Sequence, residues 1–210
     1  MKRNLIFLIS LIVVTFLSYR IESFEFLLIA IILLLLVFLI LLGIISIFKT
    51  INPKKFKTPL LMLAVCLAGV LASLLRPYDE AILEDGNSSE KLKYAYETDQ
   101  KDRMQLKSYI LGELNPRDKK RLKQVKEICK QENDLKPIDK FHAAFVYHHS
   151  DNSKDYKMAS QLAAAAAEAP SLQEHYQVQW LSKAAFDRWR VSIGKPQKFN
   201  TQGKFSIDLE

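Results

Sequence analysis

Two acidic side chains fall on the apolar faces of predicted helices, where a carboxylate can serve a ligand or catalytic site. On a helix predicted from about residue 89 to 114, Asp99 and Arg103 share one stripe with four apolar side chains, those of Leu92, Tyr96, Leu106 and Ile110. Asp99 and Arg103 are four residues apart, so their side chains can meet. We expect a buried salt bridge that fixes helix register, half of a functional site, or a solvated pair.

The last predicted helix repeats this pattern. It opens at a capping box, residues 171–174, and closes at Gly194. Asp187 lies near the centre of a stripe that also holds Trp180, Ala184 and Val191, whereas Arg188 points about 100° away. Asp187 is therefore a second candidate for a buried carboxylate, with partners from another segment.

Three histidines, His142, His148 and His149, flank the core side of a helix predicted over 137–149. His142 and His149 are two helical turns apart, too far to chelate one ion, so no metal site is predicted. His149 can act as a general base if Asp99 or Asp187 orients it. The sequence has no nucleophile elbow, phosphate loop, dinucleotide fingerprint or zinc-ligand pair, and we expect no cofactor.

Four segments in order resemble motifs of a bacterial family catalogued as domain of unknown function 6624. Residues 99–103 (DQKDR) look like its Asp-Gln-x-x-Arg opening, and 148–151 (HHSD) are similar to its Gln-His-x-Asp turn. Residues 180–188 look like its Trp-Leu-Ala-Ala…Asp-Arg helix. Residues 194–202 (GKPQKFNTQ) are similar to its closing Gly-x-Pro-Gln-x-Tyr/Phe-Gly-Thr-Gln.

The resemblance covers about residues 94–202 and brings no established activity. It implies that the following residues belong to one constellation: Asp99, Arg103, His149, Asp187, Arg188, Gln197 and Gln202. Thr201 lies in the same closing motif and joins the candidate ligand-binding residues. Two positions depart from the family pattern: His148 stands for Gln, and Asn200 stands for Gly, a change that the αL conformation tolerates.

Three apolar runs precede these motifs and predict a membrane anchor. Residues 5–19, 26–48 and 58–75 contain no Lys, Arg, Asp or Glu. The middle run would span about 35 Å as a helix, enough to cross a bilayer core of about 30 Å. The first run follows Met-Lys-Arg and could be a signal peptide, but it ends without an Ala-x-Ala-type site, so we favour an uncleaved span.

The charges around these runs predict the orientation. Lys2 and Arg3 precede the first run, and four lysines, Lys49, Lys54, Lys55 and Lys57, fill the loop between the second and third. The positive-inside rule places both in the cytoplasm, so everything after Arg76 should be periplasmic or extracellular. Residues 1–76 hold eight Lys or Arg against two Asp or Glu, which accounts for six of the net seven positive charges. This excess reflects topology, and we expect no nucleic-acid binding.

The sequence thus predicts an all-α protein with three N-terminal transmembrane helices. They cover residues 1–76, a linker covers 77–89, and a compact soluble domain of about five helices covers 90–210, with an ordered loop at 194–202. The second soluble helix should begin at Asn115-Pro116 and end near Asn133. The run Ala163–Ala167 should form a close-packing face.

Two functional classes follow. The first is a membrane-anchored interaction module for a peptide-like or polar ligand, because Gln197 and Gln202 hold amides and carboxylates better than they move protons. The second is a hydrolase that uses His149 with Asp99 or Asp187 as an acid–base pair. The expected partners are the lipid bilayer and a protein or peptide; the sequence does not define an oligomeric state.

Overall fold

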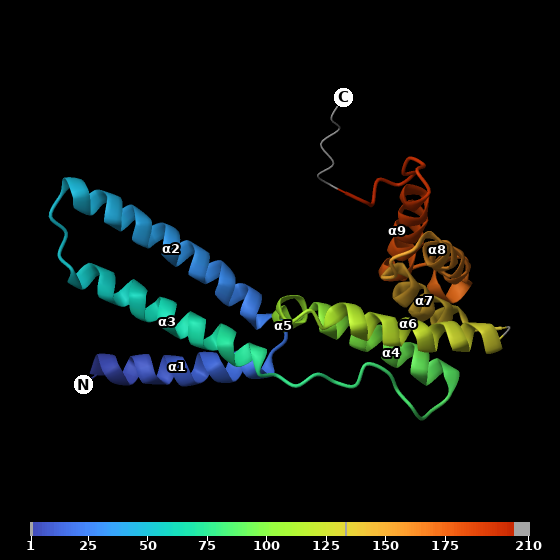
Figure 1. Ribbon diagram of the computed structural model, residues 1–210, viewed down its shortest axis with the longest axis horizontal. Coiled ribbons are helices and arrows are strands. Elements are labelled where there is room, and N and C mark those ends of the chain that lie inside the picture. The colour runs from blue at the N-terminus through green and yellow to red at the C-terminus, as the bar shows by residue number, and fades with distance from the viewer. Residues whose placement is uncertain (1, 133, 204–210) are drawn as a thin grey trace. The chain divides into compact units, whose positions relative to one another are not determined.

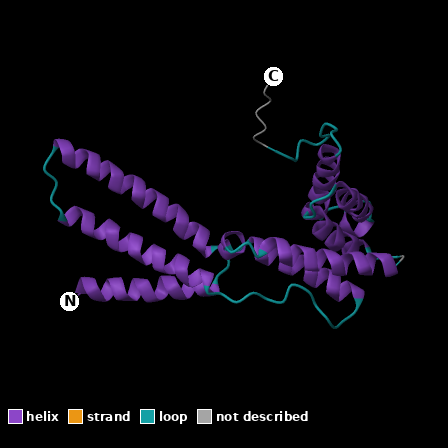
Figure 2. Ribbon diagram, viewed as in Figure 1, coloured by secondary structure: helices purple, strands orange, loops and turns teal. Residues whose placement is uncertain are grey.

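The computed structural model describes residues 2–132 and 134–203, and over these residues all regular structure is helical (Figures 1 and 2). The all-α prediction is confirmed. The predicted helix end near Asn133 and the last residues of the predicted domain, 204–210, lie outside the described residues. The chain divides into two compact units. Unit 1 is Met1–Tyr78 with Lys101–Glu113, and unit 2 is Asp79–Gln100 with Leu114–Glu210.

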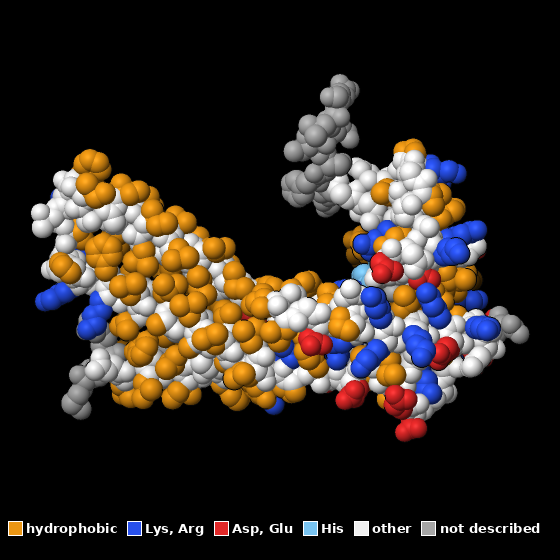
Figure 3. Space-filling view, viewed as in Figure 1, with side chains coloured by type: hydrophobic (Ala, Val, Ile, Leu, Met, Phe, Trp, Pro, Cys, Tyr) orange, Lys and Arg blue, Asp and Glu red, His pale blue; other side chains and the backbone are white. Residues whose placement is uncertain are grey.

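Unit 1 is built on three apolar helices, α1 (Lys2–Arg20), α2 (Phe24–Phe48) and α3 (Lys54–Leu74). Helix α3 packs against both α1 and α2. Gly69 on α3 makes this close approach possible, because a Cβ there would lie 2.6 Å from Leu28 Cδ1 and 2.8 Å from Val14 Cγ1. Most other apolar side chains of these helices face outward, and Figure 3 shows them covering the visible surface of the three helices.

Two helices within the described residues, α2 and α3, are long and apolar enough to cross a membrane. The apolar part of α1, Asn4–Arg20, is shorter, so length and composition support two candidate spans where the sequence predicted three. The difference arises because the uncharged run in α1, residues 5–19, is shorter than the uncharged runs in α2 and α3.

The first helix of the predicted soluble domain is interrupted. The structure has α4 (Ser88–Arg103) and a short α5 (Leu106–Ile110) where one helix over 89–114 was predicted. At the break, the backbone N–H of Ser23 donates to Met104 O at 3.1 Å, and Leu106 N–H donates to Glu25 Oε1 at 3.1 Å. These bonds to the start of α2 satisfy backbone groups that an unbroken helix would pair internally. Beyond the break, the predicted apolar stripe is wrong at Ile110, which is exposed, whereas Leu106 is half-buried.

Unit 2 contains the first part of α4, followed by α6 (Leu114–Gln131), α7 (Pro137–His148), α8 (Ser153–Ala167), the 3₁₀ turn η1 (Pro170–Leu172) and α9 (Tyr176–Ser192). Helix α8 packs between α7 and α9. Its small residues Ala159, Ala163 and Ala166 are buried, which lets the neighbouring helices approach closely. In the predicted Ala run, Ala163 and Ala166 thus face the neighbouring helices, whereas Ala164 and Ala165 are exposed.

Two predicted helix starts are wrong. Helix α6 begins at Leu114, so Asn115 lies inside it rather than capping it. The predicted capping box at 171–174 overlaps the 3₁₀ turn instead, and α9 begins at Tyr176. There the Gln179 side chain donates to Ala167 O at 3.0 Å and Leu172 O at 3.2 Å, which satisfies carbonyls at the end of α8 and in the turn. The αL conformation predicted after α9 is confirmed, since Gly194 has φ 71°.

Candidate functional site

His149 and Asp99 lie in contact inside unit 2. His149 immediately follows α7, and its Nδ1 lies 2.9 Å from Oδ2 of Asp99 on α4. The Asp99 side chain is 1% exposed, whereas that of His149 is 18% exposed. A buried carboxylate thus holds one nitrogen of a histidine that retains access to solvent, which is the arrangement of an acid–base pair.

The Asp99 carboxylate has further polar neighbours. Gln100 Nε2 donates to its Oδ2 at 2.8 Å, and Arg121 Nε lies 4.0 Å from its Oδ1. Arg121 comes from α6, is fully buried, and also binds Asp118 at 2.7 Å. These donors and the nearby cation offset the hydration that Asp99 loses on burial.

Aromatic contacts set the position of the His149 ring. The ring packs edge-on against Phe145, with centroids 5.3 Å apart, and against His148 at 5.6 Å. The neighbouring Ser150 hydroxyl donates to Asp155 Oδ2 at 2.7 Å. Ser150 is therefore engaged in the turn that follows rather than placed as a nucleophile for His149.

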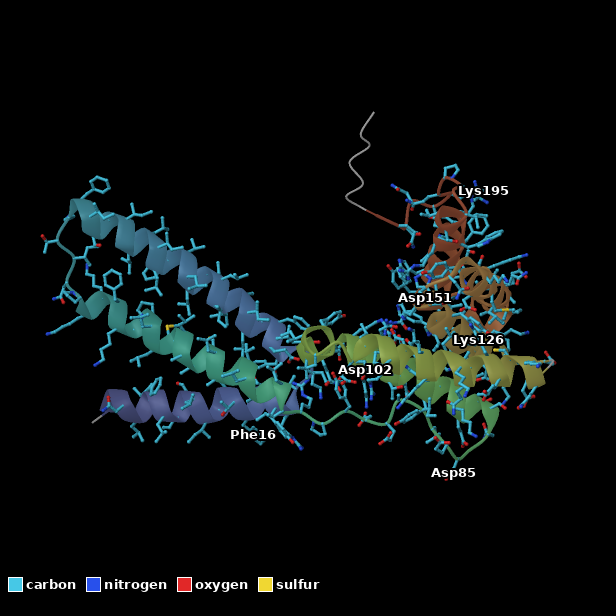
Figure 4. All side chains as sticks on the ribbon, viewed as in Figure 1. Phe16, Asp85, Asp102, Lys126, Asp151 and Lys195 are labelled. Carbon is cyan, nitrogen blue, oxygen red and sulfur yellow. The ribbon has the colours of Figure 1, made fainter. Side chains whose placement is uncertain are left out.

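That turn is held by Asp155, the first-turn acid of α8. Its Oδ2 accepts from Lys126 Nζ and from Asn152 Nδ2, each at 2.7 Å; Lys126 and the turn residue Asp151 are labelled in Figure 4. Burial alone would raise the Asp155 pKa, but the bonds from Lys126, Ser150 and Asn152 lower it.

Asp187 on α9 serves a different segment, the C-terminal tail. The fully buried carboxylate accepts backbone N–H bonds from Lys198 at 2.7 Å, Phe199 at 3.1 Å and Thr201 at 3.0 Å, and a hydroxyl bond from Thr201 at 2.9 Å. Burial acts to raise the pKa of this carboxyl, but these donors outweigh it, so the Asp187 pKa lies below its usual value.

The two tail glutamines bind backbone. The Gln197 side chain accepts from Gln202 N–H at 2.6 Å and donates to the Gln202 carbonyl, which closes the loop on itself. Gln202 Nε2 donates to Ala184 O on α9 at 3.1 Å. Asn200, where the family resemblance has Gly, adopts φ 56°. The described bonds attach the tail to α9.

The sequence-predicted residues fall into two groups, a His149–Asp99 group and an Asp187 group with Gln197, Thr201 and Gln202. Arg188 links them, because it follows Asp187 and its Nη1 donates to His148 O at 2.8 Å. Arg103 is half-buried at the end of α4, where its carbonyl accepts from Tyr109 OH at 3.0 Å; the predicted Asp99–Arg103 pair stays a prediction. On α9 the predicted stripe is partly wrong, since Trp180 and Val191 are exposed.

Sequence reasoning missed Arg121. It lies on α6 at helical spacing from Val125 and Ile128, and all three are buried. A charged residue in register with an apolar stripe is the same signal that identified Asp99 and Asp187. Applied to residues 114–131, it would have found Arg121.

Within residues 2–132 and 134–203, no group of three or more His, Cys, Asp or Glu is placed to hold a metal ion. The chain matches no family model, no curated protein and no solved structure. The resemblance to domain of unknown function 6624 therefore stays an expectation.

Proposed function

We propose that the protein is a bacterial inner-membrane protein whose first three helices anchor a helical interaction module on the extracytoplasmic side. In this proposal α1 joins α2 and α3 as a third, uncleaved span, since all three expose apolar side chains along their lengths. The lysine-rich loop between α2 and α3 supports a cytoplasmic location for that loop.

The observation that carries the interaction role is the fixed tail of unit 2. The bonded polar atoms belong to the side chains of Asp187, Gln197 and Gln202, and their partners lie in the tail backbone and on α9. These three residues therefore fix the tail as a platform rather than contact a substrate. A loop fixed in this way loses little conformational entropy on binding, which favours recognition.

The platform presents aromatic rings and cations together. Phe186 packs against Trp189 and Phe199 with ring centroids 5.9 Å apart in each case. Arg190 lies over the Phe186 ring at 5.9 Å, and Lys198 over the Phe199 ring at 5.1 Å. We call these five residues the aromatic–basic cluster. Its chemistry suits a peptide-like partner that carries an apolar side chain and a carboxylate.

Site-specific photo-crosslinking in the full-length protein tests this role. A photoreactive amino acid at Phe199 should give a discrete adduct in cells, and Lys198→Glu should reduce it by charge repulsion. The matched position is Tyr176, an exposed aromatic at the other end of α9, which should give no such adduct. Equal adducts from both positions, or an adduct indifferent to Lys198→Glu, would contradict the proposal.

A second candidate, a hydrolase, is favoured by the 2.9 Å contact between His149 and Asp99. Purified full-length protein can be assayed against ester and peptide substrates. Hydrolysis that is lost in His149→Ala and shows an altered pH profile in Asp99→Asn would support catalysis. Activity unchanged in both variants would exclude this pair as its source.

A further inference from the structure

In the segment Lys101–Glu113 of unit 1, polar side chains are buried and apolar side chains are exposed, which is the reverse of a surface that faces water. Four of its polar residues are buried: Asp102, Gln105, Lys107 and Ser108 are 2%, 5%, 3% and 0% exposed. Four of its apolar residues face outward: Met104, Tyr109, Ile110 and Leu111 are 48%, 55%, 60% and 58% exposed. In water-soluble proteins, lysine and arginine side chains are almost never fully buried, whereas large apolar side chains are the ones most often buried.

Specific partners within unit 1 hold the polar side inward. Lys107 Nζ donates to the carbonyl of Arg76 and lies 3.4 Å from the centre of the Tyr78 ring. The Ser108 hydroxyl lies 3.3 Å from Tyr78 OH. Contacts with Arg76 and Tyr78, which follow α3, therefore fix the orientation in which the polar side chains of the segment point inward.

The segment is fixed at one end of the three apolar helices. Its backbone bonds join Met104 to Ser23 and Leu106 to Glu25, at the start of α2. Arg76, just past α3, donates to Tyr19 O at 3.1 Å and Ile21 O at 2.8 Å, at the end of α1. The end of α1, the start of α2 and the end of α3 thus meet here, opposite the lysine-rich loop.

Apolar exposure continues from the segment onto the neighbouring helix ends. Tyr19, Ile21 and Phe26 are all exposed at this same end of unit 1. Where α2 and α3 cross a bilayer, this level is the boundary between acyl chains and headgroups, where tyrosines and the apolar faces of interfacial helices are favoured.

We propose that Lys101–Glu113 inserts its apolar side into the extracytoplasmic headgroup–acyl boundary of the bilayer that unit 1 spans. The occupant of this surface is lipid. The inference rests on the proposed membrane anchor, and it adds a second contact with the membrane, made more than twenty residues after the last span ends. The observation that carries it is the reversed burial along this segment, where polar side chains are buried and apolar side chains are exposed both on α5 and on the residues that flank it.

Spin labels on the full-length protein in phosphatidylethanolamine–phosphatidylglycerol vesicles test the insertion. In a background with Cys66→Ala and Cys129→Ala, labels are placed at Ile110→Cys and, independently, at Leu111→Cys. Collision with oxygen, which concentrates in lipid, is compared with collision with a water-soluble nickel chelate. Two further labels serve as references for the collision rates. Leu34→Cys, on the exposed face of α2, is the reference for lipid, and Tyr176→Cys, on α9, is the reference for water.

We expect both segment labels to collide with the nickel chelate several-fold less than the Tyr176 label, and with oxygen more, though less than the Leu34 label. If the segment labels collide with the nickel chelate as often as the Tyr176 label does, the segment is not inserted and the proposal is overturned. A Leu34 label that still collides mainly with oxygen would show in the same experiment that the membrane anchor is correct. Segment labels shielded from both reagents would also overturn the insertion, because protein would then cover the surface. A Leu34 label in water would defeat the anchor itself.

Discussion

Glu25, at the start of α2, and Arg76, just past α3, form a buried ion pair with Arg76 Nη2 3.2 Å from Glu25 Oε2. Their side chains are 1% and 9% exposed. Arg76 also binds carbonyls at the end of α1, and Glu25 also accepts from Leu106 N–H. One ion pair therefore connects all three apolar helices and the segment after α4.

Breaking this pair should destabilise unit 1. Arg76→Ala leaves Glu25 as an uncompensated buried charge, which costs roughly 3–5 kcal/mol. Thermal unfolding in detergent should show a melting temperature lower by several degrees. The control is Lys93→Ala, which removes an exposed pair with Glu97 at 3.8 Å and should cost less than about 1 kcal/mol. Equal melting temperatures for the two variants would show that the Glu25–Arg76 pair is not structural.

Loss of the Asp187 carboxylate should release the tail. Asp187→Ala removes the acceptor of three backbone N–H groups and the Thr201 hydroxyl, so trypsin should cut after Lys198 much faster than in the wild type. Mass spectrometry of the native full-length digest identifies the cut. Glu168→Ala, at the exposed end of α8, serves as the control and should leave the rate unchanged. Rapid cutting of the wild-type protein would contradict a fixed tail.

The same carboxylate makes tail attachment pH-dependent. The folded-state pKa of Asp187 is lowered, so its contribution to stability is fully present above its unfolded pKa of about 3.9. That contribution is lost as the pH falls through the lower, folded-state value. Protection of the tail from an acid-active protease such as pepsin should decline only below about pH 4, and Asp187→Asn should abolish that decline. A decline of equal size in Asp187→Asn would show that another group controls the attachment of the tail.

Asp99 should matter more for stability than His149. Asp99→Ala removes a 1% exposed carboxylate and takes a negative charge from 4.0 Å away from the buried Arg121, at a cost of roughly 3–5 kcal/mol. His149→Ala removes a more exposed side chain and should cost less. Denaturant unfolding of the full chain measures both, and the Arg103→Ala single and double variants test the predicted Asp99–Arg103 coupling. A larger loss for His149→Ala would reverse this assignment.

The membrane orientation has a direct test. The lysine-rich loop predicts a C-terminus outside the cytoplasm, so a C-terminal alkaline phosphatase fusion should be active and a fluorescent-protein fusion dark. Neutralising Lys49, Lys54, Lys55 and Lys57 together should weaken this preference. An inactive phosphatase fusion with a bright fluorescent one would reject the proposed location.

Periodicity predicted the local features of this chain well. Asp99 and Asp187 were identified as buried from helical spacing, and both are. Gly194 was identified as an αL residue because few other residues adopt positive φ without strain. Each of these features depends on residues within a few positions of the one concerned.

The features that the sequence analysis did not predict depend on residues far away in the sequence. The break between α4 and α5 depends on Ser23 and Glu25, about eighty residues earlier. Local propensity favours continuing the helix there, and the tertiary bonds override it. The partners of Asp187 likewise lie in a tail without helical period, so spacing located the carboxylate but could not supply its donors.

The division of the chain into units has a practical consequence for expression. Because Lys101–Glu113 belongs to unit 1 although its flanking residues belong to unit 2, no single cut releases unit 2 intact. A secreted fragment that starts at Asp79 would carry Met104, Tyr109, Ile110 and Leu111 without the helices that orient them, and should aggregate. Replacing 101–113 with a flexible Gly-Ser linker would instead remove these exposed apolar side chains and keep both parts of unit 2.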